Sequence, residues 1–329
     1  MTRLPVGKLP GALLSELLGG LSSTDGAVRV GPALGEDAAA IDVPAGTLVA
    51  ATDPVTLTSS EAGRYVVLIN ANDVAVMGVA PRWFLVTVLL PPGTTDDDVR
   101  ALFATLTAAL DEVGATPVGG HTEVTPAVNE PVLVGQMLGL APHGEVVRTG
   151  GAAAGEVLVQ VGAVPVEGAA VLAAEQPDHL GALDPVELAA ADGALDDPGI
   201  SVVAAALRAA ALGATAMHDP TEGGLAAGLH ELAHASQVAL RVDGAAIAWF
   251  APGLAVCRQL DCDPWATLAS GCLLATLPAD VAQGALDTLR REGFAAAAIG
   301  AVESGRGVHV GSRALPWPDR DEVARRLGD

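Results

Sequence analysis

Short apolar runs of strand length alternate irregularly along the chain with stretches whose apolar residues recur at helical spacing. The run 83–90 is continuous and lies between Pro81 and Pro91, which is typical of a buried strand. Predicted helices cover residues 64–77 and 96–113, before and after this run. Because strands and helices follow no regular order, we expect a layered α+β architecture rather than a doubly wound sheet.

A segment rich in glycine and other small residues, 142–156, separates two strand-like runs. We therefore predict a domain boundary near residue 145, with an N-terminal domain over 1–145 and a C-terminal domain over 146–329. The length of 329 residues suits two domains, each large enough for its own core. The second half again mixes the two kinds of element, with predicted helices at 166–175, 200–212, 223–236 and 279–291 and predicted strands at 157–161, 238–242, 272–277 and 297–302.

The charge balance excludes several classes of partner. The chain carries 39 acidic and 17 basic residues, a net charge of −22, which repels nucleic-acid phosphates. Apolar runs stay far below the roughly 20 residues that a membrane-spanning helix needs, and the N-terminus lacks a signal-peptide pattern. The cysteines at 257, 262 and 272 match neither a disulfide framework nor a zinc motif. We therefore expect a cytoplasmic protein with no nucleic-acid partner and no membrane contact.

Three isolated carboxylates stand at turns or within a helix. Asp37 stands in a glycine-rich acidic turn, and Asp53 follows a strand-like run. Asp73 stands beside Asn72 inside the predicted helix 64–77, where such a pair is uncommon because both side chains compete for backbone hydrogen bonds. Mg²⁺ prefers oxygen ligands and usually combines one or two carboxylates with substrate phosphates. Together the three acids indicate a magnesium–nucleotide site, although each alone also fits an ordinary turn or a solvated face.

Two consecutive glycines, Gly119-Gly120, follow a predicted strand at 116–118 and precede His121 and Thr122. Glycine lets backbone N–H groups approach a ligand closely, so we predict a turn that contacts phosphate. A plain turn is the alternative. The sequence contains neither G-x-x-x-x-G-K-[ST] nor G-x-G-x-x-G at the start of a helix, so a nucleotide would be bound without these common phosphate loops.

The string His218-Asp219-Pro220-Thr221-Glu222-Gly223-Gly224 leads into the predicted helix 223–236. A helix N-terminus attracts anions, so Gly223 and Gly224 could contact one. Asp219 could reach a metal ion or polarise a substrate, and His218 could transfer protons. Helix capping by Asp219 and a structural role for His218 are the alternatives.

In this order, the motifs resemble those of the AIR synthase-related (PurM-like) superfamily of ATP-using enzymes. The superfamily includes aminoimidazole ribonucleotide synthetase, selenophosphate synthetase, thiamine-monophosphate kinase and the HypE-type carbamoyl dehydratase of hydrogenase maturation. The resemblance covers nearly the whole chain, and the pattern around Asp219 is most similar to the HypE branch. It rests on the strings Gly35-Glu36-Asp37-Ala38-Ala39, Thr52-Asp53, Asn72-Asp73-Val74-Ala75-Val76-Met77-Gly78, Gly119-Gly120, Asp219-Pro220-Thr221-Glu222-Gly223-Gly224-Leu225 and Ala269-Ser270-Gly271.

The resemblance implies a two-domain PurM-like fold and an ATP- and Mg²⁺-dependent enzyme. The N-terminal α/β domain would form a β-barrel across a homodimer interface, and the C-terminal domain would be α+β. Three groups of site residues follow from it: the metal ligands Asp37, Asp53 and Asp73; the nucleotide contacts Asn72, Gly119, Gly120, His121, Thr122, Gly223 and Gly224; and Asp219 with His218 in catalysis.

The implied reaction is phosphorylation, by ATP, of an amide-type oxygen or of another acceptor, either a small molecule or a protein. Two alternatives stay open: a small-molecule kinase like thiamine-monophosphate kinase, and a non-catalytic ATP-binding paralogue that acts in assembly. Two departures bear on the choice. HypE proper ends in a cysteine, whereas the last cysteine here is Cys272, so carbamoyl dehydration itself is not expected. His121 stands where most relatives have an acid, and Glu123 is a candidate replacement.

Overall fold

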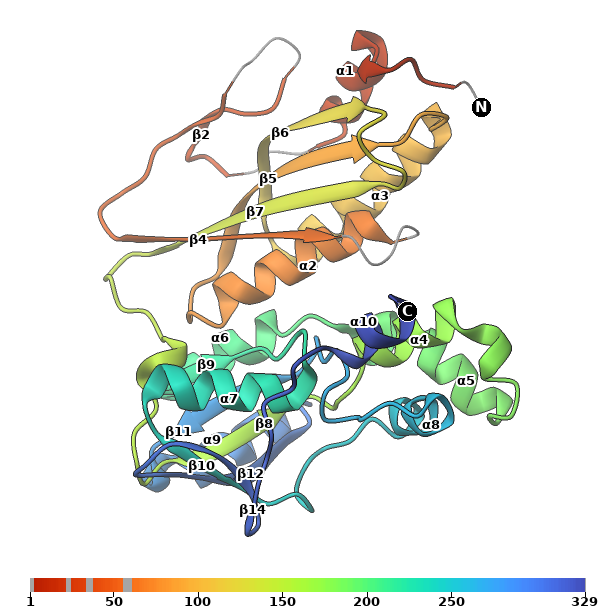
Figure 1. Ribbon diagram of the computed structural model, residues 1–329. Coiled ribbons are helices and arrows are strands. Elements are labelled where there is room, and N and C mark those ends of the chain that lie inside the picture. The colour runs from red at the N-terminus through yellow and green to blue at the C-terminus, as the bar shows by residue number, and fades with distance from the viewer. Residues whose placement is uncertain (1–2, 22–24, 34–37, 56–60, 329) are drawn as a thin grey trace. The chain divides into compact units, whose positions relative to one another are not determined.

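The computed structural model describes residues 3–21, 25–33, 38–55 and 61–328. The chain divides into two compact units, one formed by residues 1–74 and 79–145 and the other by residues 75–78 and 146–329. Each unit combines a β-sheet with helices (Figure 1). Strands and helices follow one another irregularly in both units, as the sequence predicts.

The first unit is built on a five-stranded sheet. Its order is β1 (Gly7–Lys8), β6 (Thr116–Val124), β5 (Pro81–Leu90), β7 (Val132–Ala141) and β4 (Thr47–Val55). Neighbours are antiparallel except β5 and β6, which run parallel. Helices α2 (Ala62–Ala75) and α3 (Asp96–Val113) cover one face of this sheet, α1 (Gly11–Gly19) contacts α3, and β2 (Val28–Val30) pairs with β3 (Ala40–Ile41) in a separate hairpin (Figure 1).

Local sequence explains how this unit positions its elements. Helix α3 begins at a capping box, in which Thr95 and Asp98 each accept a hydrogen bond from the other's backbone N–H. It ends at Gly114, which adopts a left-handed conformation with φ of 70°. Helix α2 approaches β7 closely because Gly135 lacks a side chain; a Cβ there would lie 2.5 Å from the Asn70 amide nitrogen. The result is a tight contact between α2 and the strands β7 and β4.

The two faces of this sheet differ in burial. On β7, Leu133 and Met137 are fully buried toward the helices, whereas Leu138 and Leu140 on the other face are only partly buried. Leu48 on the neighbouring edge strand β4 is 48% exposed. The face of the sheet away from α2 and α3 therefore carries apolar side chains that the chain does not fully cover.

The second unit contains a seven-stranded mixed sheet. Its order is β14 (Arg313–Ala314), β13 (Gly307–Val310), β10 (Ala239–Val242), β12 (Ala296–Glu303), β8 (Val157–Val161), β11 (Leu273–Leu277) and β9 (Ala216–His218). Helix α7 (Gly224–Ser236) shares one apolar core with these strands, and α6 (Val203–Ala211) and α9 (Ala279–Arg291) also pack against them.

A second group of helices in this unit packs around its own apolar cluster. These helices are α4 (Glu167–Glu175), α5 (Pro185–Asp192), α8 (Ala251–Leu260) and α10 (Glu322–Leu327). Short helical segments stand at Thr149–Gly151, Pro177–His179 and Leu195–Gly199. Cys257, Cys262 and Cys272 are free and buried, and burial raises the pKa of each thiol. They therefore act as small apolar residues.

Two local predictions are corrected by the structure. Asp53 does not end its strand, because β4 continues to Val55. Gly119 and Gly120 do not form a turn, because β6 runs through both, with a register shift against β5 between Phe84 and Leu85. The physical reason is a close approach of backbones, since a Cβ on Gly120 would lie 2.2 Å from the carbonyl oxygen of Val86.

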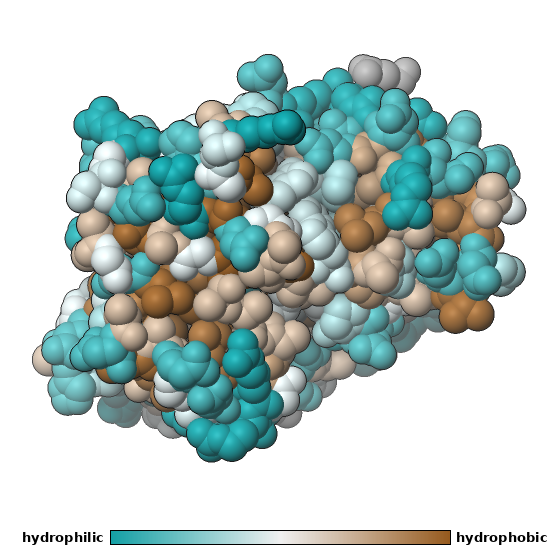
Figure 2. Space-filling view, turned by 90° about the horizontal axis from the view of Figure 1, so that it is seen from below, coloured by the Kyte–Doolittle hydropathy of each residue, from teal (hydrophilic) through white to brown (hydrophobic). Residues whose placement is uncertain are grey.

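On the face drawn in Figure 2, hydrophilic side chains are scattered among apolar ones rather than gathered into one block. Within the ranges that the structure describes, none of the helices is both long and apolar enough to cross a bilayer.

Candidate functional site

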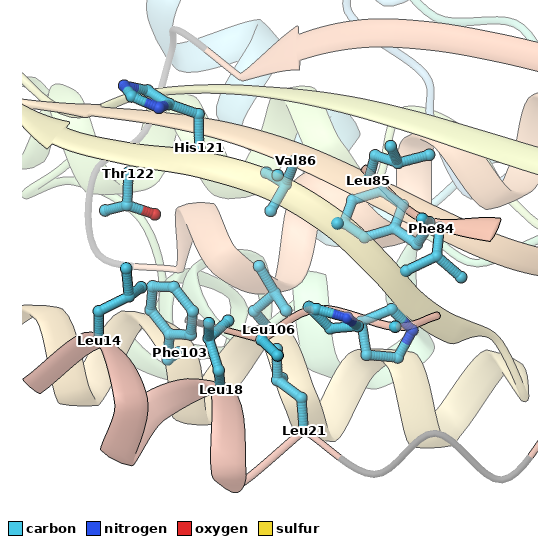
Figure 3. Close-up of a pocket in the computed structure, with 18 of the residues that line it drawn as sticks. Leu14, Leu18, Leu21, Phe84, Leu85, Val86, Phe103, Leu106, His121 and Thr122 are labelled. Carbon is cyan, nitrogen blue, oxygen red and sulfur yellow. The ribbon is translucent and has the colours of Figure 1, made fainter. Parts of the chain in front are cut away.

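A cavity of about 290 Å³ in the first unit brings together part of the predicted site. It lies between the strands β5 and β6 and the helices α1 and α3 (Figure 3). Its wall is mainly apolar, and its polar groups are few, chiefly Lys8 and Thr122. The apolar lining includes Leu14, Leu18, Leu21, Phe84, Leu85, Val86, Phe103, Leu106, Pro117 and Val118. Cavities of this kind, apolar with a few polar groups, are typical of small-molecule sites.

Four consecutive residues chosen from the sequence line this cavity: Gly119, Gly120, His121 and Thr122. Thr122 lies on the side of β6 that faces α1 and α3, whereas the imidazole of His121 lies on the opposite side of the strand (Figure 3). The Nε2 atom of His121 is 3.5 Å from a carboxylate oxygen of Glu123. The strand thus presents a hydroxyl to the cavity and a His–Glu pair to the other face of the sheet.

The predicted metal ligand Asp37 lies outside the described residues. Its described neighbours Ala33 and Ala38 both line the cavity.

Asp53 occupies a second position, at the contact between β4 and α2, where Asn70 holds its backbone. The Asn70 side-chain oxygen accepts the Asp53 N–H at 2.8 Å, and its NH₂ group donates to the Asp53 carbonyl at 3.2 Å. The NH₂ group also donates to Val66 O at 2.8 Å, one turn earlier on α2. Asn70 is fully buried, and the Asp53 side chain is exposed. Sequence reasoning missed Asn70, although its place two residues before Asn72 on an apolar helix was a usable signal.

Asn72 and Asp73 lie further along α2 than Asn70. Asn72 is fully buried and Asp73 is partly buried. Asp73 comes three residues after Asn70, so it stands close to the same side of the helix. The helix α2 therefore carries both the residue that fixes Asp53 and a second carboxylate.

Asp53 on β4 and Gly120 at the cavity are aligned across the sheet by the register of the strands between them. Asp53 is opposite Gly135, Gly135 is opposite Val86, and Val86 is opposite Gly120. Three strand spacings separate Asp53 from Gly120, which corresponds to about 14 Å. Among the described residues there is no group of three or more His, Cys, Asp or Glu side chains placed to hold a metal ion. The first unit thus presents a cavity at β6 and carboxylates at β4 and α2.

In the second unit, His218 and Asp219 stand where β9 leads into the loop before α7. The Nε2 atom of His218 is 2.7 Å from a carboxylate oxygen of Glu231, a residue of α7. This contact fixes the orientation of the imidazole. The Asp219 side chain is buried, with 6% of its residue surface exposed. The catalytic role given to these two residues stays a prediction.

Gly223 and Gly224 both adopt positive φ, at 77° and 66°. The N–H of Gly223 donates to a carboxylate oxygen of Asp321 at 2.8 Å, and the N–H of Gly224 donates to the carbonyl of Thr221 at 3.0 Å. Both N–H groups are therefore satisfied within the protein in this conformation.

Glu167, the first residue of α4, has a strongly perturbed carboxyl group next to this loop. Burial raises its pKa to about 7, a hydrogen bond with Ser270 opposes the rise, and the nearby carboxylates of Asp321 and Glu222 add to it. A carboxyl group that titrates near neutral pH can take up or release a proton. In the sequence, Glu167 is an ordinary acid in the first turn of a helix, so nothing marked it.

The fold and the family can now be identified by comparison with known proteins. A crystal structure of the hydrogenase maturation protein HypE in complex with ATP matches with a TM-score of 0.77 at 26% identity, covering 88% of this chain and 90% of that one. A thiamine-monophosphate kinase from Stenotrophomonas maltophilia K279a shares the fold, with a TM-score of 0.73 at 23% identity over 88% and 93% of the two chains. The architecture is the two-domain PurM-like fold that the sequence predicts.

Sequence comparison gives the family. The model of the AIR synthase related protein N-terminal domain matches residues 35–141, and that of the C-terminal domain matches residues 153–312. The carbamoyl dehydratase HypE of Rhizobium leguminosarum bv. viciae is 27% identical over 307 residues, covering 88% of this chain and 85% of that protein. The chain belongs to the AIR synthase related family.

Proposed function

We propose that this protein is an ATP- and Mg²⁺-dependent enzyme of the HypE-like type, which phosphorylates an amide-type oxygen or a small-molecule acceptor. The observation that carries the proposal is the cavity at β6, since Gly119 to Thr122, selected from the sequence as nucleotide contacts, line it. The similarity to a HypE structure with ATP supports the same reading.

The cavity suits the base of the nucleotide. Its apolar wall, with Phe84 and Phe103 among the lining residues, favours a flat ring system. Thr122 offers a hydroxyl, and Lys8 offers a positive charge in a chain of net charge −22. We infer that the base enters between α1, α3 and β6, and that the phosphates extend toward the carboxylates.

The carboxylates suit magnesium. Asp53 and Asp73, together with Asp37 outside the described residues, supply the oxygen ligands that Mg²⁺ combines with phosphate oxygens. The exposed Asp53 side chain on a backbone held by Asn70 fits such a ligand. Bound there, Mg²⁺ would neutralise charge on the phosphates. The residues of the chain itself hold the metal ligands in place and align the nucleotide.

The second unit would supply the groups that handle the acceptor. The His218–Glu231 contact leaves an oriented imidazole that can move a proton at its other ring nitrogen. Asp219 would orient the acceptor beside it. Phosphoryl transfer needs positioning and charge neutralisation more than covalent chemistry by the protein, which agrees with the lack of an activated nucleophile in this set.

We further infer a homodimer formed through the first unit, in a cytoplasmic protein. The face of the sheet away from α2 and α3 carries partly exposed apolar residues such as Leu48, Leu138 and Leu140. Burial of such a face against a second copy is favourable, since apolar surface gains from leaving water. Sedimentation equilibrium tests this inference, which a stable monomer at micromolar concentration would refute.

Product analysis tests the reaction. Incubation with γ-labelled ATP, Mg²⁺ and candidate amides is expected to give the dehydrated product of the amide together with labelled phosphate, and D219N should reduce turnover while leaving ATP affinity within about twofold. A phosphorylated small molecule that accumulates as the final product would instead favour a kinase like thiamine-monophosphate kinase, whose fold this chain shares. ATP binding without turnover on any acceptor would favour a non-catalytic paralogue.

A further inference from the structure

Described residues that directly follow β2 or directly precede β3 form part of the cavity wall. Gly31, Pro32 and Ala33 line the cavity after β2, and Ala38 and Ala39 line it before β3. The hairpin itself is short, with β2 of three residues and β3 of two. Two such strands are not stable alone in water, so the wall depends on other contacts for its place.

Asp25 supplies those contacts at the start of the hairpin. One carboxylate oxygen accepts the Arg82 Nε–H at 2.7 Å and the Trp83 indole N–H at 3.0 Å. The other oxygen accepts from Arg82 Nη2 at 3.1 Å and from the backbone N–H of Ala27 at 2.9 Å. The Arg82 guanidinium also lies 4.5 Å from the centroid of the Trp83 ring. All donors except the Ala27 N–H belong to the first two residues after Pro81 on β5.

The contact is partly shielded from solvent, since the Arg82 side chain is 36% exposed. The side chain of Asp25 is 15% exposed, and Trp83 is fully buried. The paired Arg82 guanidinium holds the pKa of the Asp25 carboxyl down at about 2. Charge-assisted hydrogen bonds of this kind, partly removed from water, are stronger than those on an exposed surface.

The strand that holds Asp25 is also the strand that lines the cavity. Arg82 and Trp83 bind Asp25, and the next three residues of β5, Phe84 to Val86, line the cavity. We propose that Asp25 is a positioning residue for the ligand site, which fixes the β2–β3 hairpin to β5 so that the cavity keeps its wall. This inference rests on the proposed function, because the ligand in question is the nucleotide.

The chain offers a matched control in the same hairpin. Asp42 pairs with Arg29, but their side chains are 59% and 70% exposed, so the pair contributes little to order. D42N should therefore leave the cavity wall unchanged. At position 25, both carboxylate oxygens accept two N–H donors each, so the NH₂ group of an asparagine would face donors and could not replace either oxygen.

The experiment compares D25N with D42N by hydrogen exchange and by Mg-ATP binding. In D25N, backbone amides of β2 and β3 should exchange faster while those of α3 are unchanged, and the Trp83 indole N–H resonance should move. The Kd for Mg-ATP should rise about tenfold, because a small displacement of the residues that form the cavity wall also displaces the bound ligand. D42N should match the wild type in all three measurements. D25A serves as a second variant.

The exchange and binding measurements test separate steps of this proposal. Unchanged exchange in both D25N and D25A would overturn the anchoring contact. Faster exchange with unchanged Mg-ATP affinity would show that the hairpin does not position the ligand, which also overturns the proposal. If the wild-type chain binds no ATP, the proposed function fails, and the exchange measurement still decides whether Asp25 holds the hairpin.

Discussion

Replacement of Asn70 tests how the structure holds Asp53 in place. Asn70 makes three hydrogen bonds, two of them to the backbone of Asp53 and one to Val66. Since each such bond contributes about 1 kcal/mol to stability, N70A should lower the free energy of unfolding by about 3 kcal/mol. The single-bond control is T52V, which removes the hydrogen bond from Thr52 to the Gly135 carbonyl and should cost about 1 kcal/mol.

An aspartate at this position sharpens the test through its charge. In N70D, one carboxylate oxygen can still accept the hydrogen bond from the Asp53 N–H. The other oxygen takes the place of the Asn70 NH₂ group and therefore faces the carbonyl oxygens of Asp53 and Val66. Burial and these carbonyls favour the protonated acid and so raise its pKa in the folded state. When the pKa of an acid is higher in the folded state, the free energy of unfolding is highest at low pH and falls as the pH rises through the folded-state pKa. N70D should therefore be about 4 kcal/mol less stable than the wild type at pH 8 and about 2 kcal/mol less stable at pH 5.

Urea unfolding at the two pH values measures these differences. The wild type and N70A serve as references, because neither introduces a titrating group at this site. A deficit of N70D that is the same at pH 5 and pH 8, or an N70A as stable as T52V, would refute the role given to Asn70.

Two further predictions concern Gly120 and Glu167. A Cβ on Gly120 would meet Val86 O at 2.2 Å, whereas one on Gly119 would meet only a Leu85 methyl at 3.6 Å; G120A should therefore cost about 2–3 kcal/mol of stability and weaken Mg-ATP binding, while G119A stays folded with near wild-type stability in thermal unfolding. Equal stability of the two variants would contradict the close approach of β6 to β5. Burial raises the pKa of Glu167 in the folded state to about 7. Ionisation of this carboxyl therefore destabilises the folded protein above about pH 7. Below the ordinary pKa of a glutamate, the carboxyl is protonated in both the folded and the unfolded state and has no such effect. E167Q should thus gain about 1–2 kcal/mol over the wild type at pH 8.5 and nothing at pH 4.5, and an equal gain by the exposed control E175Q would count against this explanation.

The sequence allowed the architecture to be predicted because most elements have local signals. The apolar run between two prolines marked β5, and apolar residues at helical spacing marked α3. Gly119-Gly120 was misread as a turn, because glycine can serve a close backbone approach as well as a reversal, and only the register of β5 against β6 distinguishes them.

The candidate site was predictable only in part. Asp53, Asn72 and Gly119 to Thr122 stand out in the sequence because polar or glycine residues interrupt apolar elements. Asn70 and Asp25 did not, since their importance depends on partners at residues 53 and 82–83, which are distant in the sequence. The perturbed Glu167 also depends on residues far along the chain, Ser270 and Asp321.

Calorimetric titration with a non-hydrolysable ATP analogue tests the central claim most directly. The account predicts saturable binding at one site per chain that requires Mg²⁺, and an affinity at least about tenfold lower in D53N. T122V, which removes the hydroxyl facing the cavity, should also weaken binding. The absence of binding at millimolar nucleotide with Mg²⁺ present, or equal affinity in the wild type and D53N, would contradict it.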